Sequence, residues 1–208
     1  PDEIFDQVTM LNKQSLEHFE RPLSNIVFMG MGEPMMNYPN VMKAIAKITS
    51  PEGMGMSPKR ITVSTSGIPK MIVKMADEYP RFKLAVSLHS AIEETRNQIM
   101  PFSTSFPLTD LQDSIRYWFS KTKARVTYEY VVWKNINDSK AEIDALVRFC
   151  KKTPSKVNLI EYNPVGNDQF NQADDDAINQ YAAALEKSHI PVTIRRSRGK
   201  DIDAACGQ

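Results

Sequence analysis

A glycine-rich turn that carries a carboxylate is the most distinctive chemical feature of the sequence. The segment Gly30-Met31-Gly32-Glu33-Pro34 follows directly on the apolar run at 25–29. Its two glycines would let the backbone approach a ligand closely, and Pro34 would stiffen the exit from the turn. Glu33 offers a carboxylate, for which an ammonium group is a natural partner. The third glycine of a dinucleotide-binding fingerprint is missing, and such a segment taken alone is more often an ordinary tight turn.

Three further segments end apolar runs with side chains that could bind a ligand. The hydroxyls of Thr62-Val63-Ser64-Thr65-Ser66-Gly67 could bind polar parts of a nucleoside or amino acid, or equally cap the next helix. Ser87-Leu88-His89-Ser90 contains a histidine of a kind that is more often a hydrogen-bonded structural residue than a base. Asn163-Pro164 supplies an amide suited to the edge of an adenine or to a carboxylate, although alone it is a turn signal.

The two cysteines, Cys150 and Cys206, are too few for a disulfide framework. Cys150 lies within a helical pattern, and we expect it to be structural. Cys206 follows the basic stretch 195–200 and lies in a segment of small residues that would admit a ligand, and nearby cations would favour its thiolate. A cysteine of unknown placement is buried and inert about as often as it is reactive.

The order of apolar runs along the sequence predicts the strands and helices that position these polar side chains. Short β-branched runs bounded by turn residues predict strands at 25–29, 60–64, 83–88, 125–132, 157–162 and 192–196. Helical patterns occupy 3–19, 38–49, 68–78, 108–121, 140–151 and 173–188. This alternation predicts parallel strands with crossover helices, in a barrel or a doubly wound sheet. The polar groups follow strand ends, where the loops of an α/β barrel form the site, so we expect a ligand at one mouth.

Composition limits the class of protein. The 208 residues, 41% of them hydrophobic, can bury one sizeable core, so we expect one domain over 1–208. No apolar run approaches a membrane helix and no signal peptide opens the chain, which makes the cytoplasm the most economical location. A formal charge of +1 is unlike the strongly basic body of a dedicated nucleic-acid binder. The basic clusters at 59–60, 151–152 and 195–200 are solvated faces or contact surfaces.

Together the motifs resemble those of the radical S-adenosylmethionine (SAM) RNA methyltransferases that act on C2 of adenine. The resemblance runs over essentially the whole chain, and its most specific part is Asp201-Ile202-Asp203-Ala204-Ala205-Cys206-Gly207-Gln208. It implies an α/β fold, a partial (βα)6 radical-SAM barrel of parallel strands in which the first strand and the cluster loop are absent. It also implies that Glu33 faces the methionine ammonium in a SAM pocket lined by Gly32, Glu33, Ser64, Ser87, Leu88, His89 and Asn163.

The resemblance implies a radical mechanism on ribosomal RNA (23S) and transfer RNA. Cys206 would be methylated by one SAM, and a second SAM would be cleaved reductively to a 5'-deoxyadenosyl radical. That radical would take a hydrogen from the S-methyl group, and the resulting carbon radical would add to C2. C2 is an electron-poor ring carbon and a poor nucleophile, so ordinary polar transfer would fail.

The resemblance stops at the iron-sulfur cluster. Reductive cleavage needs an electron donor and a 4Fe-4S cluster on three closely spaced cysteines, and the chain holds no such motif and no other metal set. Family members carry it upstream, with a small N-terminal domain and a further cysteine that resolves the protein-RNA intermediate. The chain begins at Pro1 rather than Met and ends at Gln208, two residues after a cysteine and with no charged or polar tail, so both ends read as cuts through a longer protein. We expect the parent to be an enzyme and the chain as given not to turn over.

Other classes remain as alternatives. One is methylation at adenine C8, as in the related antibiotic-resistance enzymes. Another is an unrelated α/β-barrel aldolase or phosphate-binding isomerase, which the lack of a convincing Schiff-base lysine at a strand end disfavours. A third is a non-catalytic RNA-binding module using 195–200, weakened by the near-neutral charge and the absence of aromatic-rich binding motifs. A Cys-x3-Cys-x2-Cys run upstream of Pro1 would settle the class.

Overall fold

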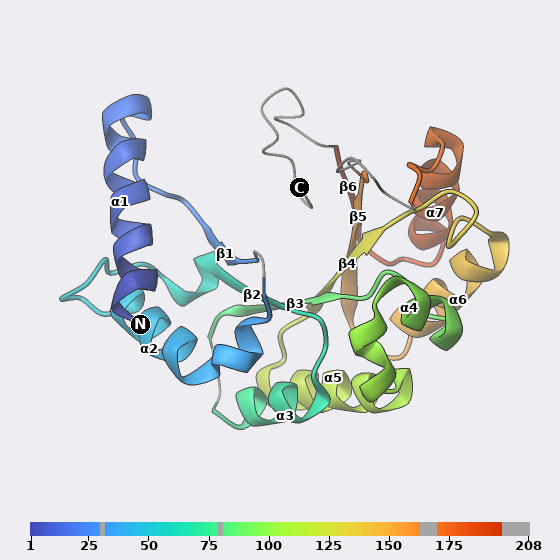
Figure 1. Cartoon of the computed structure of the whole chain (residues 1–208), viewed down its shortest axis with the longest axis horizontal. Coiled ribbons are helices and arrows are strands. Elements are labelled where there is room, and N and C mark those ends of the chain that lie inside the picture. Colours follow the sequence, from blue (N-terminus) through green and yellow to red (C-terminus); the bar gives the residue numbers. More distant parts are fainter. Residues whose placement is uncertain (30–31, 79–80, 163–169, 197–208) are drawn as a thin grey trace.

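A six-stranded parallel sheet, whose strands lie side by side in chain order, forms the centre of the molecule (Figure 1). The computed structural model describes residues 1–29, 32–78, 81–162 and 170–196. The predicted α/β class and the sequential parallel order are confirmed, and every predicted strand lies within two residues of its observed bounds. The strands are β1 (Ile26–Phe28), β2 (Ile61–Thr65), β3 (Lys83–Ser87), β4 (Val126–Val131), β5 (Ser155–Ile160) and β6 (Val192–Arg195).

Helices in the crossover connections cover one face of this sheet. In Figure 1, α1 and α2 lie toward the β1 end and α6 and α7 toward the β6 end. The six predicted helices are present within two residues of their expected bounds. They are α1 (Asp2–Phe19), α2 (Tyr38–Thr49), α3 (Pro69–Asp77), α5 (Leu108–Thr122), α6 (Lys140–Cys150) and α7 (Asp175–Lys187), joined by the short turns η1 (Pro34–Asn37), η2 (Pro58–Arg60) and η3 (Pro101–Ser105).

One helix, α4 (Glu93–Ile99), was not predicted. Its sequence, Glu-Glu-Thr-Arg-Asn-Gln-Ile, has no apolar stripe, and the residue that it buries is Arg96, which is 1% exposed. A polar heptapeptide carries too little hydrophobic signal to be recognised as a helix, and isolated helices of this length are unstable. Tertiary contacts therefore stabilise α4.

The alternation of side chains along each strand divides the sheet into an apolar and a polar face. In β4, Tyr128 and Tyr130 are buried in the core cluster, where their rings pack on Phe149 of α6 and Tyr181 of α7. Glu129, between them, points to the other face, and its carboxylate accepts a hydrogen bond of 2.8 Å from Asn158 of β5, its partner in the register. The core thus lies between sheet and helices, and polar side chains line the opposite face.

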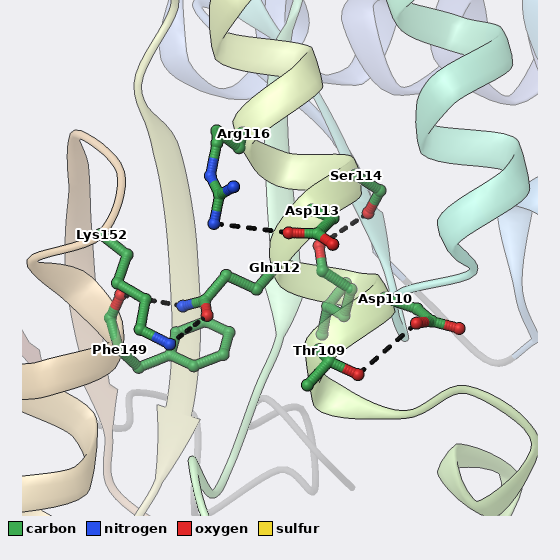
Figure 2. A network of polar contacts seen from close by, with 9 residues as sticks. Thr109, Asp110, Gln112, Asp113, Ser114, Arg116, Phe149 and Lys152 are labelled. Atoms are coloured by element: carbon green, nitrogen blue, oxygen red, sulfur yellow. Dashed lines mark hydrogen bonds and ion pairs between the residues drawn. The ribbon is translucent and has the colours of Figure 1, made fainter.

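Polar contacts between helices reinforce this packing. The buried side chain of Gln112 on α5 donates to the carbonyl of Phe149 on α6 at 3.4 Å and accepts from Lys152 Nζ at 2.6 Å (Figure 2). Lys152, one half of a basic pair noted in the sequence, is thereby used within the fold. On the exposed side of α5, Arg116 pairs with Asp113 at 3.4 Å.

No helix in the described ranges is long and apolar enough to cross a membrane.

Candidate functional site

A pocket of about 340 Å3 lies at the carboxyl edge of the sheet, where the loops after β1, β2 and β3 meet. We call it the carboxyl-edge pocket, and its volume is within the range of small-molecule sites, roughly 300–1,000 Å3. The structure brings together here five of the predicted cofactor residues, which lie at the carboxyl ends of β2 and β3 or in the loops after β1 and β3. The lining residues are Met29, Gly32, Glu33, Pro34, Ser64, Thr65, Ser66, Ser87, His89, Met100 and Phe102.

The carboxylate of Glu33 is held in place by three hydrogen bonds. Oε1 accepts from the amide of Met35 at 2.9 Å, which caps η1, and Oε2 accepts from the amide and hydroxyl of Ser66 at 2.6 and 2.7 Å. Since each carboxylate oxygen can accept two hydrogen bonds, Oε1 retains room for a further donor. No Lys or Arg of the described residues forms an ion pair with Glu33, so its charge is left to attract a cationic ligand group.

The segment after β2 uses its hydroxyls within the loop. Thr65 Oγ1 accepts from the amide of Gly67 at 3.1 Å, and Ser66 binds Glu33. The residue before α3 is Ile68, which makes no side-chain capping bond, so the helix-cap interpretation of this motif is wrong. Ser64 is 5% exposed and lines the pocket, and its hydroxyl has no hydrogen-bond partner among the residues that the structure describes.

His89 is fixed by hydrogen bonds at the end of β3. It adopts a left-handed conformation with φ of 57°, and its carbonyl accepts from Asn137 Nδ2 at 2.6 Å. Its ring accepts from the amide of Val131 through Nδ1 at 3.1 Å and meets Trp133 edge-on, 5.4 Å between centroids. Burial, with a smaller contribution from the charge of Arg96, lowers the pKa of His89 to about 3. The imidazole is therefore neutral at pH 7, and Nε2 carries its proton as a donor.

The remaining predicted residues do not all join this group. Leu88 is fully buried in the core and does not line the pocket, so the expectation of a cofactor contact finds no support in its side chain. Asn163 and Cys206 lie outside the described residues. Cys150 is buried, as expected of a structural cysteine, and burial raises the pKa of its thiol to about 12.

Sequence reasoning missed the apolar part of the pocket. Met100 and Phe102 flank the start of η3, directly after the unpredicted α4, and Phe102 is 47% exposed. The only sequence feature that could have indicated this apolar lining was the segment Met100-Pro101-Phe102. Asn137, fully buried, was also missed: it holds His89 and Val131 through their carbonyls and accepts from the amide of Trp133 at 2.7 Å.

Comparisons with known proteins agree with this architecture. No protein-family model matches the chain. It is 65% identical over all 208 residues to proteins named probable dual-specificity RNA methyltransferase RlmN from Christiangramia forsetii and Flavobacterium psychrophilum, of which it spans 59% and 60%. Among solved structures, a radical SAM methyltransferase from Sphaerobacter thermophilus matches with a TM-score of 0.94 and 39% identity, over 98% of this chain and 60% of that one. The fold is therefore that of a radical SAM methyltransferase, as the motifs indicated.

Proposed function

Since the chain is homologous along its whole length to named RNA methyltransferases, we propose that this protein is a radical SAM enzyme that methylates RNA. The observation that carries the proposal is the convergence of Gly32, Glu33, Ser64, Ser87 and His89 on the carboxyl-edge pocket. These residues come from three loops spread over almost sixty positions of the chain. Their meeting at one edge is what a ligand site in a parallel α/β fold requires.

The groups in the pocket fit the parts of SAM. Glu33, which forms no ion pair with a Lys or Arg of the described residues, would present its negative charge to the methionine ammonium, and its Oε1 has acceptor capacity to spare. The hydroxyl of Ser64 and the Nε2 proton of His89 offer hydrogen bonds to polar atoms, and Met100 and Phe102 offer apolar surface to an adenine. Asn163 would complete the set. The same carboxylate would repel a phosphate, which disfavours the phosphate-binding isomerase alternative.

The 4Fe-4S cluster does not fit the residues of this chain. Such a cluster takes three cysteine ligands with one iron open to SAM, and the sequence has two cysteines, far apart. Within the described ranges, no group of three or more His, Cys, Asp or Glu could hold a metal ion. The chain spans about three fifths of the length of these relatives. We therefore assign the cluster, and the electron donor that reduces it, to the whole protein.

For the substrate, we propose C2 of adenine in 23S ribosomal RNA and transfer RNA, with Cys206 as the methyl carrier, in the cytoplasm. The support is the resemblance of the segment Asp201 to Gln208 to the family ending, together with the chemistry of C2. An electron-poor ring carbon accepts a carbon radical more readily than it attacks a methyl cation. The thiol of Cys206 would serve as the nucleophile that first takes the methyl group.

The test compares full-length wild-type protein, carrying its cluster, with the Cys206→Ala variant. Wild type should yield 2-methyladenosine in digested RNA, and its peptide containing Cys206 should gain the mass of one methylene. Cys206→Ala should yield no methylated RNA while it retains SAM and cluster binding. A product methylated at C8 would move the protein to the alternative reaction, and methylation by Cys206→Ala would contradict the carrier role.

A further inference from the structure

Arg96 is a buried cation behind the carboxyl-edge pocket. The Arg96 residue is 1% exposed, and among the described residues its guanidinium donates only to backbone carbonyls and to one sulfur. Nη1 donates to the carbonyl of Ser87 at 2.9 Å and to that of Leu88, and Nη2 donates to the carbonyl of Ser66 at 2.6 Å. Nη1 also approaches Met100 Sδ at 3.7 Å, while Nε has no partner among the described residues.

This buried cation forms no ion pair with a carboxylate of the described residues. The carboxylate of nearby Glu93 instead accepts from the amide of Leu108 at 2.8 Å. Burial lowers the pKa of Arg96 to about 10, against the favourable charge of Glu93, so the guanidinium stays charged at pH 7. A buried charge is costly, and an apolar side chain of similar volume would fill the space at less cost. The presence of an arginine here is therefore better explained by the backbone carbonyls that its guanidinium binds.

The guanidinium of Arg96 binds the segments after β2 and β3, and the segment after β2 in turn binds the loop after β1. Ser66 follows β2, Ser87 ends β3 and Leu88 follows it, so the guanidinium connects the carboxyl ends of neighbouring strands. Ser66 in turn donates its amide and hydroxyl to Glu33, which follows β1. A continuous set of hydrogen bonds thus runs from Glu33 through Ser66 and Arg96 to the end of β3. All three loops line the pocket, whereas Arg96 itself does not.

Gly67 shows how closely the loop after β2 packs against this cation. Its φ is 99°, in the left-handed region that favours glycine. A Cβ added at this position would lie 2.9 Å from Leu111 Cδ1 and 3.4 Å from Arg96 Nη2. The backbone of this loop is therefore set directly on the guanidinium and on the core.

We propose that Arg96 is a positioning residue that sets the spacing of the three loops and so determines the affinity of the pocket for SAM, which it does not touch. The identity of the ligand rests on the proposed function. The fork of the guanidinium can reach two loops at once, whereas a lysine would place one point charge with three donors. If Arg96 positions the loops, only arginine can fill this role. If only its positive charge mattered, lysine could replace it.

The experiment uses full-length protein with its cluster and the variants Arg96→Lys and Arg96→Met. Arg116→Met on the exposed side of α5, where Arg116 pairs with Asp113, is the matched control (Figure 2). SAM affinity is measured by calorimetry well below each unfolding midpoint, together with affinity for substrate RNA. Amide hydrogen exchange of the SAM-free proteins is followed at 66–67 and 88–90. If Arg96→Met does not fold, Arg96→Lys carries the test.

Both Arg96 variants should lose SAM affinity by roughly tenfold to a hundredfold, as displacement of positioning groups does. RNA affinity should stay unchanged, and exchange should rise at 66–67 and 88–90 but not in the control. Full SAM affinity in Arg96→Lys, or exchange equal to that of the control, would overturn the proposal. If wild type itself fails to bind SAM, the proposed function fails, and the exchange data alone then decide whether Arg96 braces the loops.

Discussion

The two edges of the sheet each carry a pocket, and the two differ in how their polar groups are held. The pocket at the amino edge, which we call the amino-edge pocket, is the larger at about 540 Å3. Its cations Lys59, Arg81 and Lys83 are exposed, and Lys121 pairs with Asp77 at 3.6 Å. In the smaller carboxyl-edge pocket, Glu33 and His89 are fixed by hydrogen bonds from neighbouring loops. Fixed polar groups, rather than volume, distinguish the candidate site.

The direction of the strands explains this difference. Every loop that leaves a parallel strand emerges at the carboxyl edge, so groups distant in sequence gather there and can bond to one another. At the amino edge the chain enters the strands with long, solvated side chains, which pay a large entropy cost when they are fixed. Equivalent substitutions at the two edges, or at closely and loosely packed positions, should therefore differ in their effect on stability or on SAM affinity.

The largest effect is expected for Gly67→Ala, compared with Gly55→Ala. Both glycines have positive φ, 99° and 60°, but an added Cβ at Gly55 meets nothing within 4 Å. Each variant should lose about 1–2 kcal/mol from left-handed strain. Gly67→Ala should lose about 1–3 kcal/mol more by overpacking against Leu111. Urea denaturation of both variants measures the difference, and equal losses would contradict the tight packing behind the pocket.

Glu33→Ala should have the next largest effect, now on binding. It removes the charge that we propose faces the ammonium and leaves the Ser66 amide without its acceptor, and should weaken SAM binding by about 1.5–3 kcal/mol. Lys83→Ala, in the amino-edge pocket, is the control and should leave the affinity unchanged. Calorimetric titration of the full-length proteins provides the comparison. A larger loss in Lys83→Ala than in Glu33→Ala would reverse the assignment of the two edges.

The smallest effect, taken per pH unit, is a pH dependence of stability from His89. Its pKa is lowered from 6.5 to about 3, so between these values the unfolded state binds the proton and the native state does not. Stability should therefore be full above pH 6.5 and fall as the pH drops toward 3, with a slope of at most about 1.4 kcal/mol per pH unit.

The matching variant is His89→Asn, because asparagine tolerates the left-handed backbone at this position. Unfolding free energies between pH 6 and 4 should show a shallower slope than wild type. His18→Gln, at an exposed position of α1, is the control. An unchanged slope in His89→Asn would mean that the imidazole is protonated in the native protein.

Sequence patterns were sufficient to predict the fold and which polar groups gather at the carboxyl edge of the sheet. Alternating elements with short connections leave few arrangements other than sequential parallel strands, and Glu33, Ser64, Ser87 and His89 follow strand ends. Leu88, between Ser87 and His89, does not line the pocket because alternation at the end of β3 turns its side chain into the core, so its contact with the cofactor stays a prediction. Arg96 was missed because a charged residue in a polar segment predicts a solvated surface, and only the tertiary fold reveals its burial.

The most direct test of the carboxyl-edge site is amide hydrogen exchange of the full-length protein with and without SAM. Binding there should slow exchange at 32–36, 64–67 and 87–90, the segments after β1, β2 and β3. Exchange around the amino-edge pocket, at 57–60, 81–83 and 121–124, should stay the same. Protection confined to the amino-edge segments, with the three carboxyl-edge loops unaffected by SAM, would contradict the account.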